Sequence, residues 1–275
     1  MRRCRASLAS DGRLAHHGSM VIQEPAGFVL REAGSKRVLV REAYAESVSA
    51  ALLAGTGCEP AGNGGRGTLQ RFAYEDGHGL VRTYLRGGMV AHVLRDAYVL
   101  VNRPLRELRV HAHVHAAGLA VPEPLGACWE RRGMLVRGAF SAKVIPAKHL
   151  QDYLTTDAGD DEVLRRCGAV IRQMHDLGVW HADLQVRNIL VGDGEVYLID
   201  FDNARLRGGV SPLQRARNLF RLRRSFEKNG LPLGQFNVIE EGYGPEKPAA
   251  WVGRVYGLKG KLSDALSERG HGGIR

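Results

Sequence analysis

Residues 179–202 read VWHADLQVRNILVGDGEVYLIDFD, a stretch in which polar residues interrupt two apolar runs. Asp183 and Asn188 lie between the first and second apolar runs, and Asp200 ends the second. The segment NILVGDGEVYLIDFD predicts a β-hairpin with its turn at 192–194, because glycine and aspartate there suit a tight turn between strands. Such a hairpin brings Asp183, Asn188 and Asp200 to one edge of a lobe.

These three side chains have the chemistry that phosphoryl transfer needs. Asp183 can orient and deprotonate an attacking hydroxyl, while Asn188 and Asp200 can hold Mg²⁺ on nucleotide phosphates. Amide and carboxylate oxygens are hard ligands of the kind that Mg²⁺ prefers. His181 is expected to support the loop through hydrogen bonds. For Asp202 two roles stay open, a carboxylate beside the metal or a cap of the next turn.

The chain changes character near Ile145. Before that point, short apolar alternations separated by glycine turns predict strands, and after it helical patterns dominate. This order predicts an α+β protein in two lobes, with a ligand bound between them. We expect a flexible tail at 1–20, a strand-rich front lobe at 21–145 and a mainly helical lobe at 146–275.

The formal net charge of +10 points to an anionic partner, either a nucleic acid, an anionic membrane or a phosphorylated substrate. Basic segments here lack the interleaved aromatic residues that single-stranded nucleic acids stack on, so no nucleic acid is expected. No apolar run approaches the roughly 20 residues needed to span a bilayer. The four cysteines form no CxxC pair, which argues against a zinc site or a disulfide framework.

Seven arginines fall between residues 205 and 224. Within SPLQRARNLFRLRRSFEKNG, the apolar side chains Leu213, Ala216, Phe220 and Phe226 lie near helical spacing. The pattern predicts a basic amphipathic helix on the surface of a lobe. Its arginines can form an ordinary solvated face or a patch that faces an acidic surface.

Specific motifs give this chain a resemblance to a known family. HADLQVRN matches the H-x-D-x₄-N catalytic loop of the protein-kinase-like fold, and IDFD stands where D-F-G usually stands. The blocks RTYLRGG, GLAVPEPLGA, GVWHADLQVRNILV and VYLIDFDNARLR resemble the lipopolysaccharide-core kinases, most of all the branch that acts on 3-deoxy-D-manno-octulosonic acid (Kdo). The similarity runs from about Gly62 to Lys228. The chain lacks a long activation loop after Asp202, so peptide recognition is not expected.

The resemblance implies a bilobal protein-kinase-like fold and a set of roles. Asp183 is the implied catalytic base, and Asn188 and Asp200 are the implied Mg²⁺ ligands. A glycine-rich turn between the first two strands of the front lobe covers the ATP phosphates, supplied here by Gly64, Gly65 and Gly67. The third strand carries Arg82 where the family usually has Lys, and Glu107 on the next helix pairs with it. Arg can still contact phosphate, as a fork rather than a point charge.

The resemblance also implies a reaction and a place. The reaction is transfer of the ATP γ-phosphate to a hydroxyl of Kdo in the lipid A-core, at the cytoplasmic face of the inner membrane. Basic residues favour such an anionic surface, and Arg205 and Arg207 are candidates to bind the carboxylate of the acceptor. Two alternatives stay open: a heptose-, aminoglycoside- or choline-type kinase of the same fold, and a non-catalytic pseudokinase. Arg82 in place of Lys is the only support for the last.

Overall fold

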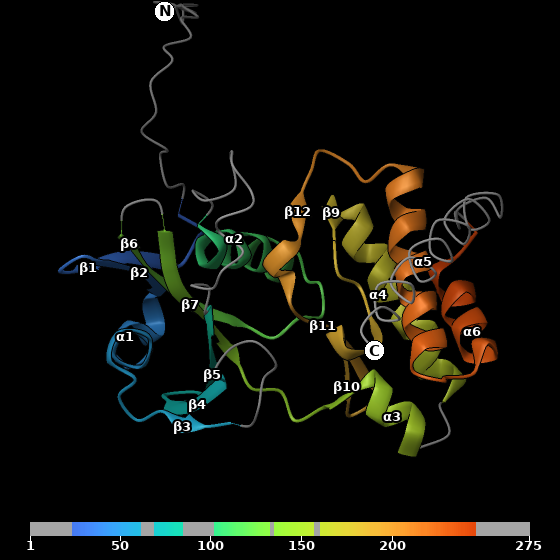
Figure 1. Ribbon diagram of the computed structural model, residues 1–275, viewed down its shortest axis with the longest axis horizontal. Coiled ribbons are helices and arrows are strands. Elements are labelled where there is room, and N and C mark those ends of the chain that lie inside the picture. Colours follow the sequence, from blue (N-terminus) through green and yellow to red (C-terminus); the bar gives the residue numbers. More distant parts are fainter. Residues whose placement is uncertain (1–23, 62–68, 85–101, 133–134, 157–159, 246–275) are drawn as a thin grey trace, which may run out of the picture.

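The computed structural model describes residues 24–61, 69–84, 102–132, 135–156 and 160–245. A β-rich lobe and a helical lobe lie side by side (Figure 1), which confirms the predicted bilobal α+β fold. The predicted tail at 1–20 and the glycine-rich turn with Gly64, Gly65 and Gly67 lie outside the described residues. Residues 144–147 lead from one lobe to the other; the boundary at 145 stays a prediction.

In the described residues of the first lobe, seven strands form one antiparallel sheet in the order β1-β2-β6-β7-β5-β4-β3. The strands are β1 (Phe28–Ala33), β2 (Lys36–Arg41), β3 (Glu59–Pro60), β4 (Leu69–Tyr74), β5 (Gly77–Tyr84), β6 (Pro124–Arg132) and β7 (Leu135–Lys143). The β1–β2 hairpin pairs with β6 at one edge. Because this hairpin precedes the strands expected from the resemblance, Arg82 lies on the fifth strand rather than the third.

The same hairpin changes the place of the glycine-rich turn. Residues 62–68 connect the third strand to the fourth, whereas a connection between the first two strands was expected. The expectation took the strand just before the glycine-rich turn, at β3, as the first strand of the family pattern, so the N-terminal hairpin was not part of that count. The order of elements from β3 to β7 is otherwise the predicted one.

Two helices cover opposite faces of the sheet because its side chains alternate. α1 (Ala45–Ala54) packs on the face that carries Val38 and Val40. α2 (Arg103–Ala116) packs on the other face, where Leu39 points. The period-two alternation of a strand sends neighbours to opposite faces, so β2 contributes to both apolar clusters. The α2 helix, which carries Glu107, therefore lies against the sheet.

Four helices account for most of the described part of the second lobe: α3 (Leu150–Thr156), α4 (Asp161–Asp176), α5 (Pro212–Lys228) and α6 (Leu233–Tyr243). Short strands join them: β8 (Lys148–His149), β9 (Val179–Trp180), β10 (Ile189–Gly192), β11 (Glu195–Leu198) and β12 (Arg205–Leu206). α4 and α6 approach closely at Gly168, where an added Cβ would lie 2.1 Å from the carbonyl oxygen of Ile239. This lobe has an apolar core of its own.

The buried face of α5 differs from the predicted one. Ala216, Leu219, Leu222 and Phe226 are buried, whereas Leu213 is 43% exposed and Phe220 is half-buried. The helix is so rich in leucine and phenylalanine that two apolar registers fit its sequence, and the neighbouring elements select one. No helix within the described ranges is both long and apolar enough to cross a membrane.

Candidate active site

The β10–β11 hairpin brings Asn188 and Asp200 together, as predicted. Ile189 pairs with Leu198 in the hairpin, and the pairing continues as Ile199 donates its N–H to the Asn188 carbonyl at 3.0 Å. Asp200 follows with a φ of 65°, in the left-handed region. A non-glycine residue in that region is uncommon and is often held for function. The backbone thus turns sharply where the candidate metal ligand lies.

Asp183 joins the same cluster through the Asn188 side chain. The Asn188 Nδ2 donates to the Asp183 carbonyl at 2.8 Å, which fixes the loop between these two residues. The Asp183 carboxylate is 42% exposed. Its Oδ2 accepts from Gln185 Nε2 at 3.0 Å, and its Oδ1 accepts from Arg221 at 3.1 Å. The candidate base is therefore oriented by two donors and still open to solvent.

His181 holds the start of this loop, as expected from the sequence. Its ring is buried, and its Nε2 lies 3.1 Å from the Ile199 carbonyl while its Nδ1 accepts from the Asp183 N–H at 3.2 Å. Burial lowers the pKa of His181, which favours the neutral ring with its proton on Nε2. His181 thus connects the Asp183 loop to the end of the hairpin that carries Asp200.

Helix α5 packs against the loop that carries Asp183 and bonds it through polar side chains that the sequence interpretation missed. Asn218 bonds both the N–H and the carbonyl of His181, and Ser225 Oγ accepts from the Val186 N–H at 3.0 Å. His175 Nε2 donates to the same Asn218 Oδ1 at 2.9 Å. Asn218 and Ser225 are buried. Their spacing of two helical turns, inside an otherwise apolar stripe, was the available signal.

Arg82 connects the two lobes at the site. Its Nη2 donates to both oxygens of Glu107 at 2.7 and 2.8 Å, so the predicted pair is present. Its Nη1 lies 2.8 Å from the Asp200 carboxylate. Burial alone would lower the pKa of Arg82, but the two carboxylates outweigh it and raise that pKa. Arg82 is therefore a permanent cation that connects the sheet, α2 and the metal-ligand candidate.

Glu107 is the most deeply buried carboxyl of the cluster. Its side chain is 1% exposed. Burial raises the pKa of Glu107, and the Arg82 guanidinium opposes that shift. A buried carboxylate without its partner costs several kcal/mol. Glu107 therefore needs Arg82 as its partner, and this ion pair holds the Arg82 guanidinium where it also contacts Asp200.

Asp202 does not cap the turn that follows β11, and its role as a carboxylate beside the metal stays a prediction. Its carboxylate accepts from the Arg103 Nε at 2.8 Å and also pairs with the Arg103 Nη2. Arg106 donates to its backbone carbonyl at 2.6 Å. The residue before the short helical turn at 201–203 is Asp200, so Asp202 lies within that turn and does not cap it. Asp202 instead joins the segment after β11 to the first turn of α2.

The two arginines expected at the acceptor lie on and after β12. Arg205 pairs with Trp180 in a two-stranded ladder, and its side chain is exposed. The Arg207 guanidinium lies over the Trp180 ring, 6.0 Å from its centre. Neither contacts Asp183 through a hydrogen bond among the described residues. Arg221 on α5 is the arginine that does.

The donor set at the site fits Mg²⁺. Asn188 uses its amide nitrogen toward Asp183, and no hydrogen bond within the described part of the chain engages its amide oxygen. Asp200 is 31% exposed and adds a carboxylate. No group of three or more His, Cys, Asp and Glu side chains in the described residues could bind a metal. Kinase-type sites need only one Asn and one Asp, since nucleotide phosphates complete the coordination shell.

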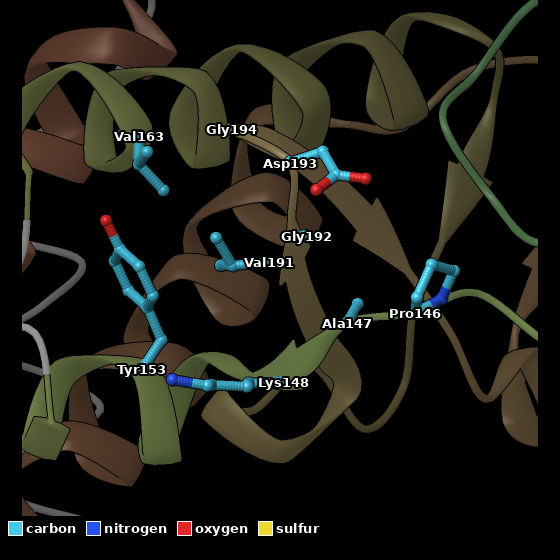
Figure 2. Close-up of a pocket in the computed structure, with 9 residues that line it drawn as sticks. All are labelled: Pro146, Ala147, Lys148, Tyr153, Val163, Val191, Gly192, Asp193 and Gly194. Atoms are coloured by element: carbon cyan, nitrogen blue, oxygen red, sulfur yellow. The ribbon is translucent and has the colours of Figure 1, made fainter.

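A separate pocket of about 450 Å³ lies at the other end of β10 (Figure 2). Its lining includes the largely apolar side chains of Tyr153, Val163 and Val191 and the charged side chains of Lys148 and Asp193. None of the predicted site residues lines it. The residues of the pocket and those of the candidate active site therefore occupy opposite ends of the same strand.

Comparisons with known proteins identify relatives of this chain. A 3-deoxy-D-manno-octulosonic acid kinase of Vibrio cholerae is 36% identical over 170 residues, covering 60% of this chain and 72% of that protein. The enzyme of the same name from Xanthomonas euvesicatoria is 37% identical over 180 residues, covering 63% and 72%. The one from Haemophilus influenzae is 32% identical over 188 residues, covering 63% and 76%.

A solved structure shares the fold. The chain described as WaaP in complex with acyl carrier protein superposes with a TM-score of 0.50 at 16% identity, covering 71% of this chain and 86% of that one. The family model described as lipopolysaccharide kinase (Kdo/WaaP) matches residues 59–243. This match includes β3 to α6 and every candidate site residue. The chain therefore belongs to the lipopolysaccharide kinase (Kdo/WaaP) family.

Proposed function

We propose that this protein transfers the γ-phosphate of ATP to a hydroxyl group of Kdo in the lipid A-core of lipopolysaccharide. Family membership and the names of the relatives support a lipopolysaccharide kinase. The single observation that carries the chemistry is the local grouping of Asp183, Asn188 and Asp200, with Arg82 from the sheet paired to Asp200. Those are the parts that kinase-type phosphoryl transfer uses.

In this proposal Asp183 is the catalytic base. A half-exposed carboxylate can accept a hydrogen bond from the acceptor hydroxyl and take its proton as the oxygen attacks phosphorus. Gln185 and the Asn188 contact keep the loop in one orientation. Positioning is the larger part of such catalysis, because the transition state forms few new covalent interactions with the protein.

Asn188 and Asp200 are the residues that would hold Mg²⁺. When bound there, the ion would neutralise charge on the ATP phosphates. Arg82 would be the cation that aligns those phosphates, and its ion pairs with Glu107 and Asp200 support that role. The glycine-rich turn with Gly64, Gly65 and Gly67 would cover the phosphates through backbone N–H groups. Replacement of the family's usual Lys by Arg leaves a cation at the site, which supports catalysis over the pseudokinase reading.

The acceptor places the reaction at a membrane surface. Lipid A is anionic and embedded in the inner membrane, so the positive charge of the chain would draw it to the cytoplasmic face. Exposed Arg217, on α5, supplies part of that charge. Binding to vesicles that contain anionic lipids, with loss of binding at high salt, is the measurement that tests this placement.

The deciding experiment is incubation of the purified chain with Mg-ATP and Kdo-lipid A, followed by mass spectrometry of the lipid. We expect a gain of one phosphate that disappears in Asp183→Ala and when Mg²⁺ is chelated. Asp200→Asn should raise the Mg²⁺ concentration needed for half-maximal rate. Transfer to a heptose or a small alcohol but not to Kdo-lipid A would overturn the proposed acceptor. Failure to bind Mg-ATP in calorimetry would favour a pseudokinase.

A further inference from the structure

Helix α5 presents one stripe of polar side chains to the loop that carries Asp183. Asn218 bonds the loop at His181, and Ser225 bonds it at Val186. Arg221 lies between them along the helix and reaches Asp183 itself. Residues three and four apart on a helix share a face, so all three point the same way. Asn218 and Ser225 bond backbone groups of the loop, whereas Arg221 pairs with the carboxylate of the candidate base, Asp183.

Arg221 differs from its two neighbours in burial. Asn218 and Ser225 are buried, but the Arg221 side chain is 54% exposed. Only its Nη1 contacts Asp183, and no other hydrogen bond of Arg221 occurs within the described residues. An exposed ion pair contributes little to stability and is readily exchanged. The fork of N–H donors on Arg221 is therefore available to a planar anion that arrives at Asp183.

We infer that Arg221 is a specificity-determining residue that binds the carboxylate of the acceptor sugar. The inference rests on the proposed function, since Kdo is a sugar acid. An acceptor hydroxyl within hydrogen-bond distance of Asp183 brings the rest of the sugar to within a few ångström of Arg221. The carboxylates of Asp183 and Asp200 repel an anionic acceptor, and Arg221 offsets that repulsion on the acceptor side.

The position of α5 favours the acceptor over the nucleotide as the ligand of Arg221. Arg82, on the sheet, already pairs with Asp200 and so lies where the candidate Mg²⁺ ligands are. Arg221 comes from a helix that packs against β9, residues 186–188 and α6, all within the helical lobe. The two arginines therefore reach the site from different lobes. We assign Arg82 to the phosphates of ATP and Arg221 to the acid group of the sugar.

The chain offers a matched control on the same helix. Arg223 is 49% exposed, and its guanidinium pairs with Glu227 at 3.4 Å, one helical turn along. Arg223→Gln removes the same charge from α5 as Arg221→Gln without touching Asp183. A difference between the two variants therefore separates a contact at the site from a general loss of attraction to an anionic lipid.

The test is steady-state kinetics with Kdo-lipid A and with its carboxyl methyl ester. For Arg221→Gln we expect the acceptor KM to rise roughly 10- to 100-fold for the acid, the range of a lost charged hydrogen bond. The KM for ATP should stay constant, Arg223→Gln should behave as wild type, and Arg221→Lys should recover part of the loss. With the methyl ester, wild type and Arg221→Gln should have the same acceptor KM.

Three results would overturn the inference while leaving the proposed function intact. An equal loss on the acid and the ester would make Arg221 a positioning residue for Asp183. A raised KM for ATP alone would move Arg221 to the transferred phosphate. An equal effect of Arg223→Gln would reduce both residues to membrane attraction. A folded wild-type chain that phosphorylates neither acceptor would overturn the proposed function, and this inference with it.

Discussion

Arg82 and Asp200 form an ion pair of 2.8 Å between the fifth strand of the sheet and the segment that follows β11. The same guanidinium holds buried Glu107 on α2. One side chain thus links three elements that are far apart in sequence. A lysine has a single ammonium group at the end of its chain, whereas the planar fork of arginine can serve two carboxylates at once.

Replacement of Arg82 by Met should reduce both stability and activity. It leaves Glu107 buried without a partner, which should lower the free energy of unfolding by about 3 kcal/mol in urea denaturation. It should also raise the KM for ATP, because the cation that aligns the phosphates is lost. The double variant Arg82→Met with Glu107→Leu should regain most of the stability, since an apolar pair can replace a buried ion pair. Recovery of phosphotransfer in the double variant would show that the pair serves stability alone.

Asp183→Asn should abolish most of the phosphotransfer while the fold stays intact. The amide keeps the shape of the side chain but cannot take a proton, so kcat should fall by roughly 10²- to 10⁴-fold. The KM for ATP should change little. Asp193→Asn is the matched control, because Asp193 lies at the turn of the hairpin with a φ of 51°, which asparagine tolerates. A kcat within a small factor of wild type in Asp183→Asn would exclude it as the base.

Much of the active site could be predicted because its chemistry is local in sequence. The spacing from Asp183 to Asn188 lies in one loop, and the turn at 192–194 fixes how Asp200 returns to it. The pairing of Arg82 with Glu107 was implied by the family resemblance, which expects a cation on one strand and a glutamate on the helix that follows. The steps that concern the loop and the hairpin need only the geometry of one element and its neighbour.

The contacts that escaped prediction depend on how distant elements pack. Asp202 meets Arg103, which is 99 residues away and in the other lobe. The polar stripe of α5 was hidden because Leu213 and Phe220 suggested one buried face, whereas Leu219 and Leu222 form the real one. Since leucine, phenylalanine and arginine alternate through this helix, its sequence alone does not select the register. Packing of α5 against the Asp183 loop determines which face of the helix is buried.

The stability of the protein should fall in mild acid because of buried neutral histidines. Burial lowers the pKa of His111 to about 3 and that of His175 to about 4. In the unfolded chain both take up protons near pH 6.5, so between that pH and about 4 the unfolded state binds more protons. Stability contributed by the neutral rings is therefore present above pH 6.5 and is lost as the pH falls. From pH 7 to pH 5 each should remove about 2 kcal/mol from the free energy of unfolding.

The variant His111→Phe tests this assignment. The His111 ring is stacked 5.4 Å from the Phe140 ring and lies near Phe201, so an aromatic substitute should be accommodated. Urea denaturation at pH 5, 6 and 7 should show a smaller loss on acidification in His111→Phe than in wild type. His113, two residues along and exposed, provides the control His113→Gln, which should keep the wild-type dependence. Parallel curves for His111→Phe and wild type would contradict the assignment.

Asn218 should matter for kcat more than for binding of either substrate. Its side chain bonds both backbone groups of His181 and also accepts from His175, so it fixes the start of the Asp183 loop. Asn218→Ala leaves these buried groups without partners and should lower the free energy of unfolding by about 2 kcal/mol. A displacement of Asp183 by a fraction of an ångström should lower kcat roughly 10- to 100-fold, because productive geometry is narrow. Neither KM should change much, since Asn218 contacts no substrate in this proposal.

Asn229→Ala is the control at the end of α5, where the amide nitrogen of Asn229 donates to the Ser225 carbonyl at 2.7 Å. If both variants lose stability but kcat falls only in Asn218→Ala, α5 acts on the reaction through the loop; equal kcat values would reduce Asn218 to a structural residue.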